Sequence, residues 1–233
     1  MIEQLKTIIG NITIIVVVLL SIIAARILFR LKLLIHSKIK FFIRLICIGM
    51  ISYGIAELVY LKYAEWPNPS DIFNISGDIL FLIAFSYLYI KSEKKELTFK
   101  DIKMIIFTLV FTISLLVYLS YVFILPNIAD VNLLEIVLDF YYPISSLILF
   151  LIVFLYQINK NEKKGFIFYI VLDAFFSYVA NMIYVYNDFT ENYGVLGILS
   201  DSLYLLGFLF LLLGLLLFFI RMYDNNEIML KQI

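Results

Sequence analysis

Carboxylates recur inside apolar stretches of this chain. The clearest stretch is Ser70-Asp71-Ile72-Phe73-Asn74-Ile75-Ser76-Gly77-Asp78, which opens an apolar run ending near Ile90. A related skeleton, Ser200-Asp201-x-x-Tyr204-x-x-Gly207, opens the last apolar run. A charged side chain at the centre of a bilayer costs about 2.5–3.5 kcal/mol even on lenient scales, so such an acid faces protein or a polar cavity. These acids are therefore the first candidates for binding chemistry.

Five apolar runs contain an acid, namely Glu57, Asp78, Asp139, Asp173 and Asp201. At a rise of 1.5 Å per residue, four of them lie about 10 Å inside the same membrane boundary, and Asp173 lies about twice as deep. The sequence places no Lys or Arg at this depth to neutralise them. The acids are expected to converge in one half of the bilayer.

Helical spacing places further polar side chains on the same face as each acid. The resulting stripes are Asp71, Asn74 and Asp78; Glu135, Asp139, Tyr142 and Ser146; Asp173, Ser177, Asn181 and Tyr184; Tyr53, Glu57 and Tyr60; and Asp201 and Tyr204. Pro143 cannot donate to the carbonyl of Asp139, so that oxygen is freed and the helix is expected to kink.

Two interpretations fit this cluster, because unpaired acids in an apolar interior are either protonated or compensated by a cation or water. The acids either link helices through Tyr, Ser and Asn, or line a pocket for a cation or polar ligand. The pocket is favoured because five runs contribute and their depths agree. Its candidate residues are Glu57, Asp71, Asn74, Asp78, Asp139, Tyr142, Asp173, Asn181, Asp201 and Tyr204. The residue types do not identify a metal, and no cofactor is expected.

Other chemistry is restricted by residue type. His36 is the only histidine and lies in a basic loop, which excludes a His-based triad or a His-containing zinc site within the membrane. No lysine lies in the interior of an apolar run, so a retinal-type Schiff base has no attachment point. An enzyme is therefore the less favoured interpretation, although catalysis by carboxylates alone stays open.

Composition requires that a bilayer surround these elements. Hydrophobic residues make up 64% of the 233 residues and charged residues 15%, with a mean hydropathy of +1.02; soluble domains have about 45–50% and ~25%. A membrane-spanning helix needs about 20 apolar residues. Seven such runs are predicted, at about 8–28, 41–63, 72–90, 104–125, 133–158, 166–186 and 196–220. We expect one all-helical, polytopic membrane domain covering residues 1–233.

Basic residues are distributed asymmetrically, although the net charge is zero. With the amino terminus outside, every Lys and Arg except Lys6 and Lys62 falls on the inner side. Lys/Arg enrichment in short cytoplasmic loops sets topology. The prediction is therefore a plasma-membrane protein with its carboxyl terminus in the cytoplasm. The basic loops are interpreted as topology signals and lipid contacts, and nucleic acid is not an expected partner.

The shared Ser-Asp-x-x-[Asn/Tyr]-x-x-Gly skeleton begins the third and seventh runs. This predicts two parallel three-helix repeats joined by the fourth run, a 3+1+3 arrangement. The alternative is that Ser and Asp recur at helix starts as N-caps, where Asp also favours the positive helix end.

The strings Trp66-Pro67-x-x-Ser70-Asp71 and Ser200-Asp201-Ser202-Leu203-Tyr204-Leu205-Leu206-Gly207-Phe208 resemble the multi-span amino-terminal regions of some bacterial and archaeal signalling proteins. Those regions precede diguanylate cyclase or histidine kinase domains. The resemblance covers most of the chain and implies a sensory membrane module, with Asp71 and Asp201 at matching positions. The chain departs from the pattern in that only residues 221–233 follow the last run.

A second likeness is carried by Ser76-Gly77-Asp78-Ile79-Leu80 and Leu172-Asp173-Ala174, which are similar to strings of lysoplasmalogenase-type multi-span hydrolases. Three functions are thus expected in order: a ligand- or ion-sensing module, a small-solute or cation transporter, and a lysolipid hydrolase. A transporter needs a polar inner gate, whereas the inner halves of the runs are apolar. In the sensor, residues 221–233 are expected to contact a cytoplasmic or membrane signalling partner.

Overall fold

The computed structural model describes residues 2–30, 37–63, 68–91, 98–119, 121, 133–160, 165–190 and 194–224. The regular elements of these residues are helical, with no strand among them. The long helices are α1 (Ile2–Arg30), α2 (Ser37–Tyr60), α3 (Ser70–Lys91), α4 (Phe99–Leu119), α6 (Leu133–Lys160), α7 (Phe166–Thr190) and α8 (Val195–Asp224). The all-helical prediction is confirmed for the described part of the chain.

Six of these helices, α1, α2, α3, α6, α7 and α8, are long and apolar enough to cross a membrane. They support a multi-pass membrane protein. Helix α4 is not among the six, and the predicted fourth run extends to residue 125, beyond the described end of α4. A count of seven spans therefore stays a prediction. Helix α2 begins at Ser37, earlier than the predicted start at 41, because its first turn is basic rather than apolar.

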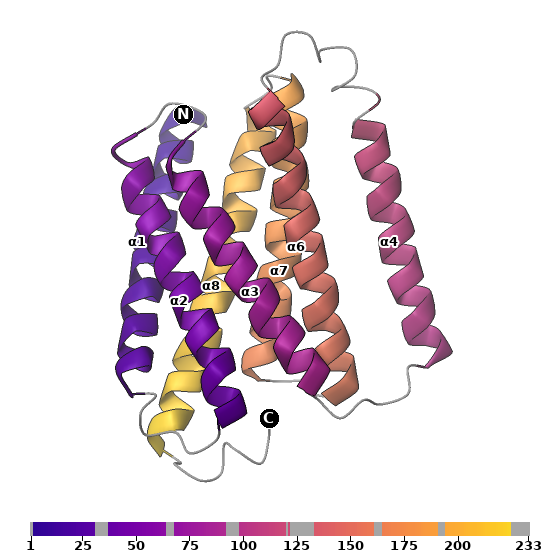
Figure 1. Ribbon diagram of the computed structural model, residues 1–233. Helices are drawn as coiled ribbons and strands as arrows, with labels where there is room; N and C mark the ends of the chain where they lie inside the picture. Colours follow the sequence, from indigo (N-terminus) through magenta and orange to yellow (C-terminus); the bar gives the residue numbers. More distant parts are fainter. Residues whose placement is uncertain are drawn as a thin grey trace.

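The six long apolar helices form a closed ring in which each packs against two neighbours. The adjacent pairs are α1–α2, α2–α3, α3–α6, α6–α7, α7–α8 and α8–α1. Figure 1 shows α4 standing apart from this ring, beyond α6. We call α1–α3 the first unit and α6–α8 the second unit. Their order around the ring is the same, which is compatible with the predicted repeat without establishing it.

The two ends of the ring are distinguished by the chain direction. Helix α1 begins at the end that we call the amino end, and α8 finishes at the opposite, carboxyl end (Figure 1). Helices α3 and α6 begin at the amino end, whereas α2 and α7 begin at the carboxyl end. The predicted orientation would place the amino end outside the cell.

Glycines allow α2 and α3 to approach closely. A Cβ on Gly49 would lie 2.8 Å from ring carbons of Phe81 and 3.3 Å from the carbonyl oxygen of Gly77. A Cβ on Gly77 would lie 2.8 Å from Cε1 of Tyr53. Small residues at helix crossings in membranes permit such backbone approach. At this crossing the Tyr53 ring packs directly against α3 at Gly77.

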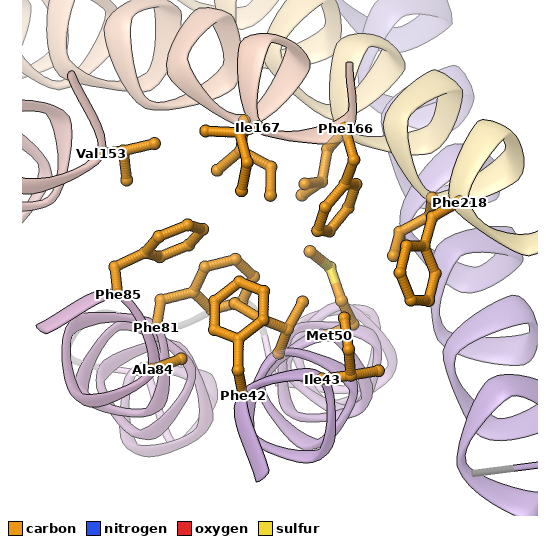
Figure 2. Packing of buried hydrophobic residues seen from close by; sticks show 14 of the residues in the cluster. Phe42, Ile43, Met50, Phe81, Ala84, Phe85, Val153, Phe166, Ile167 and Phe218 are labelled. Atoms are coloured by element: carbon orange, nitrogen blue, oxygen red, sulfur yellow. The ribbon is translucent and has the colours of Figure 1, made fainter. Parts of the chain in front are cut away.

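An apolar cluster fills the ring toward its carboxyl end. Figure 2 shows its side chains pointing toward one another from both units. The labelled members are Phe42, Ile43 and Met50 of α2, Phe81, Ala84 and Phe85 of α3, Val153 of α6, Phe166 and Ile167 of α7, and Phe218 of α8. We call this cluster the apolar plug, because it occupies the interior between the two units.

Truncating the plug is expected to destabilise the ring. Phe85 is fully buried, and Phe85→Ala should lower the free energy of unfolding by about 2 kcal/mol. This is less than the ~3–5 kcal/mol typical of soluble cores, because lipid also solvates an exposed ring. Thermal unfolding in detergent measures the change. The matched Phe107→Ala on α4, where the side chain is 73% exposed, should be nearly neutral, and equal losses would contradict the plug's role.

Candidate functional site

Asp78 joins three helices near the centre of the ring. The Tyr53 hydroxyl of α2 donates to Asp78 Oδ1 of α3 at 2.5 Å. The Ser145 hydroxyl of α6 donates to Asp78 Oδ2 at 3.0 Å and also lies 3.1 Å from the carbonyl oxygen of Tyr142. Both carboxylate oxygens are therefore held, one from within the first unit and one from the second.

Asp71 lies nearer the amino end of α3 and also bonds to α6. The Tyr142 hydroxyl donates to Asp71 Oδ1 at 2.6 Å. Asp71 Oδ2 accepts from the backbone N–H of Asn68 at 3.2 Å, while Asn68 Oδ1 accepts from the backbone N–H of Ser70 at 2.9 Å. This reciprocal arrangement, with Pro69 between them, caps the start of α3. N-capping thus accounts for part of the role of Asp71.

Capping does not account for the second copy of the skeleton. Helix α8 begins at Val195, so Ser200 and Asp201 lie more than one turn inside it. The Ser200 hydroxyl donates to the carbonyl oxygen of Ala180 on α7 at 3.1 Å. The two Ser-Asp pairs therefore occupy different positions in their helices: Asp71 helps to cap α3, whereas Ser200 and Asp201 lie inside α8.

Asn181 of α7 links the three helices of the second unit. Its Nδ2 donates to the Ser146 hydroxyl at 2.7 Å and points to the carbonyl oxygen of Tyr142 at 3.4 Å, both on α6. The Tyr204 hydroxyl of α8 donates to Asn181 Oδ1. Tyr142 and Tyr204 also lie close enough to interact electrostatically with Asp78.

Asp173 is buried where α7 packs against α8. A Cβ on Gly207 would lie 3.1 Å from Asp173 Oδ1 and 3.3 Å from the Ser177 hydroxyl oxygen. The Ser177 hydroxyl also forms a hydrogen bond with the Asp173 carboxylate. Asp173 is near enough to Asp78 for their charges to interact, and Tyr53 lies near both acids. We define the carboxylate core as Asp78 and Asp173 with their hydroxyl partners, Tyr53, Ser145 and Ser177.

The remaining predicted residues lie around this core. Asp139 is buried in α6, one turn before Pro143. Glu57 and Asn74 are half-buried, and neither side chain is hydrogen-bonded within the described part of the chain. Asp201 is half-buried and interacts with the charge of Lys6 on α1.

The expectation that no basic residue reaches the acids is wrong for Asp201. Helix α1 begins at Ile2, so Lys6 lies within a helix that packs against α8 and reaches the level of Asp201. The interactions that Asp78 and Asp173 make with described residues include none with Lys, Arg or His. The core acids thus differ from Asp201 in lacking a cationic partner there.

Several core residues were not among the ten candidates. Tyr53 and Ser177 belong to predicted polar stripes, and that stripe membership was the available signal. The predicted stripe of α6 contains Ser146 but not Ser145. The Ser145 hydroxyl bonds to α3, whereas the Ser146 hydroxyl bonds to α7. Asn68 carries a weaker signal, since Asn before Pro is typical of a helix start.

The described residues contain no group of three or more His, Cys, Asp or Glu side chains arranged to hold a metal ion. Two carboxylates and three hydroxyls instead suit a proton, a monovalent cation or an ammonium group, which need fewer anionic ligands. Comparison with family models, with curated proteins and with solved structures found no match for the chain.

Proposed function

We propose that the chain is a membrane receptor module that binds a small cation or a cationic polar ligand at the carboxylate core. The observation that carries this proposal is the approach of Asp78 from the first unit to Asp173 from the second. Two carboxylates in one low-dielectric interior cannot both remain ionised without compensation, because burial and like-charge repulsion each disfavour the charged form. A bound proton or cation supplies that compensation.

Such binding would be coupled to the arrangement of the two units. Asp78 accepts hydrogen bonds from Tyr53 of its own unit and from Ser145 of the other unit. A cation that is coordinated by the Asp78 oxygens would therefore change the contact between α3 and α6. A ligand shifts a conformational equilibrium by as much as its affinity differs between the two states. Helix α8 carries the change toward residues 221–233, where a signalling partner would bind.

The test measures thermal unfolding of the purified chain in nanodiscs while sodium, potassium or methylammonium is raised at constant ionic strength. A ligand at one hundred times its Kd stabilises the folded state by about 2.7 kcal/mol. We expect the unfolding midpoint to rise for the unmodified chain and to stay constant for Asp78→Asn/Asp173→Asn. The matched control Glu135→Gln, at the start of α6 and outside the core, should respond like the unmodified chain. Equal responses of all three proteins would refute the proposal.

A transporter is the alternative function, because the predicted parallel repeats around a central site would match a transporter architecture. The apolar plug supports the receptor instead, because its buried side chains, among the described residues, fill the interior between the core and the carboxyl end with apolar groups. Uptake of the cation that stabilises the chain into proteoliposomes, abolished in Asp78→Asn/Asp173→Asn, would favour the transporter.

A hydrolase is the third function, and one electrostatic interaction favours it. The aspartates of the two strings that are similar to lysoplasmalogenase-type enzymes, Asp78 and Asp173, are near enough for their charges to interact. One carboxyl group could activate water while the other protonates a leaving group. Release of product from a lysolipid by the unmodified chain, and none by either Asp→Asn variant, would favour this function over the receptor.

A further inference from the structure

Two arginines lie on lipid-facing surfaces of neighbouring helices. Arg26 is exposed on α1, on the same face as the exposed Ile22 and Phe29. Arg44 is exposed on α2, one turn before the exposed Ile48. Both arginines lie inside the stretches identified as membrane spans, within about two turns of the helix ends. Long basic side chains at such positions extend toward the headgroup region.

The two arginines are at the same level of the bundle. The Ser21 hydroxyl donates to the carbonyl oxygen of Met50 at 2.8 Å, which sets the register of the antiparallel pair α1–α2. Five residues onward from Ser21 is Arg26, and five residues back from Met50 is Leu45, which is next to Arg44. Equal helical rise therefore places both arginines at the same level of two adjacent helices, toward the carboxyl end.

The charge of this surface is positive and is not balanced by its own helices. Lys40 lies one turn before Arg44, and α2 begins at Ser37, so the positive end of a helix of 24 residues adds to the field. The acids of α1 and α2 are Glu3 and Glu57, both near the amino end. The surface thus combines the cationic side chains of Arg26 and Arg44 with the exposed apolar side chains of Ile22 and Ile48, which lie one turn farther from the carboxyl end.

We propose that this surface binds an anionic phospholipid, with Arg26 and Arg44 holding the phosphate and the acyl chains lying along Ile22 and Ile48. The planar guanidinium group forms paired hydrogen bonds with phosphate oxygens, which an ammonium group cannot do in the same geometry. The apolar side chains point to a lipid rather than to free phosphate, because they would gain nothing from a soluble anion. The site is separate from the carboxylate core and does not depend on the proposed function.

The test compares binding of phosphatidylglycerol and phosphatidylcholine with identical chains to the full, detergent-purified protein by native mass spectrometry. We expect the unmodified chain to prefer phosphatidylglycerol, and Arg26→Gln/Arg44→Gln to lose about 25-fold of that preference, since each basic residue near an anionic surface contributes about fivefold. Lys103→Gln on α4 is the matched control. Its ammonium group lies over the Phe99 ring, apart from α1 and α2, and the preference should be unchanged.

Several results would overturn the proposal. The unmodified chain could bind both lipids equally, the double variant could keep its preference, or inorganic phosphate could displace phosphatidylglycerol at concentrations similar to those of the lipid. A loss in Lys103→Gln equal to that in the double variant would also refute it, because diffuse charge would then suffice. If the double variant does not fold, Arg44→Gln alone should lower the preference about fivefold, and an unchanged value refutes the site.

Discussion

Replacing Gly77 by leucine is expected to lower the free energy of unfolding by about 3 kcal/mol, the upper part of the range for overpacked interiors. A Cβ at this position would already lie 2.8 Å from Cε1 and 2.9 Å from Cζ of Tyr53, and leucine adds three more carbons. The ring cannot move aside without breaking its hydrogen bond to Asp78. Either α2 and α3 separate or the carboxylate core loses Tyr53. Thermal or denaturant unfolding in detergent micelles measures the loss.

The control for this substitution is available in α1. Gly10 has nothing within 4 Å of the position that its Cβ would occupy, so Gly10→Leu adds the same atoms in open space. We expect its stability to equal or slightly exceed that of the unmodified chain, because leucine is the better helix former. If Gly77→Leu and Gly10→Leu lower the free energy of unfolding equally, Gly77 is not required for the close approach of α2 and α3.

The second large effect is expected at the contact between α3 and α6. In Tyr142→Phe/Ser145→Ala, Asp71 and Asp78 each lose the hydroxyl that α6 donates. Interhelical hydrogen bonds in membranes average only about 0.6 kcal/mol. Here, however, the acceptors are carboxylates in a buried network, for which an unmet bond costs about 1–3 kcal/mol. The double variant should therefore lose about 3 kcal/mol of stability.

A matched pair of substitutions removes the same atoms where no interhelical bond exists. Ser76 donates to the carbonyl oxygen of Ile72 within α3, and Tyr118 is exposed on α4. Ser76→Ala/Tyr118→Phe should change stability by less than about 0.5 kcal/mol, as is usual for surface changes. Stability is compared by reversible unfolding of both double variants in the same micelles. A loss in the control as large as that at the α3–α6 contact would mean that this contact is not specially stabilising.

The sequence predicts the helices of this fold well because composition and periodicity depend on local residues. The apolar runs correspond to six membrane-length helices, and a spacing of seven residues placed Asp71 and Asp78 on the side of α3 that bonds to α6. The stripe Asp173, Ser177 and Asn181 likewise follows one side of α7. In each case the pattern lies within one helix, where geometry is fixed by the backbone.

Contacts between helices were less predictable, because they depend on the rotation of each helix about its own axis. Successive residues are separated by about 100°, so Ser145 and Ser146 face different neighbours although the sequence treats them alike. Lys6 is close enough to interact with the charge of Asp201 because α1 begins at Ile2, before the apolar run. Hydropathy predicts the apolar run but not this polar first turn of the helix. No local pattern identifies Tyr53 as the partner of Asp78 across 25 residues.

The position of α4 has a consequence for how the ring holds together. Because α4 stands outside the ring, the two units are tethered halves of one polypeptide that pack directly against each other at α3–α6 and at α8–α1, like the subunits of a dimer fused into a single chain. Tethering raises the effective concentration of one half around the other to about the millimolar range for short linkers. The α3–α6 contact can then open and close repeatedly without the halves diffusing apart. The hydroxyl–carboxylate bonds between α3 and α6 can therefore be few, because the α8–α1 pair, the apolar plug and the covalent tether also keep the halves together.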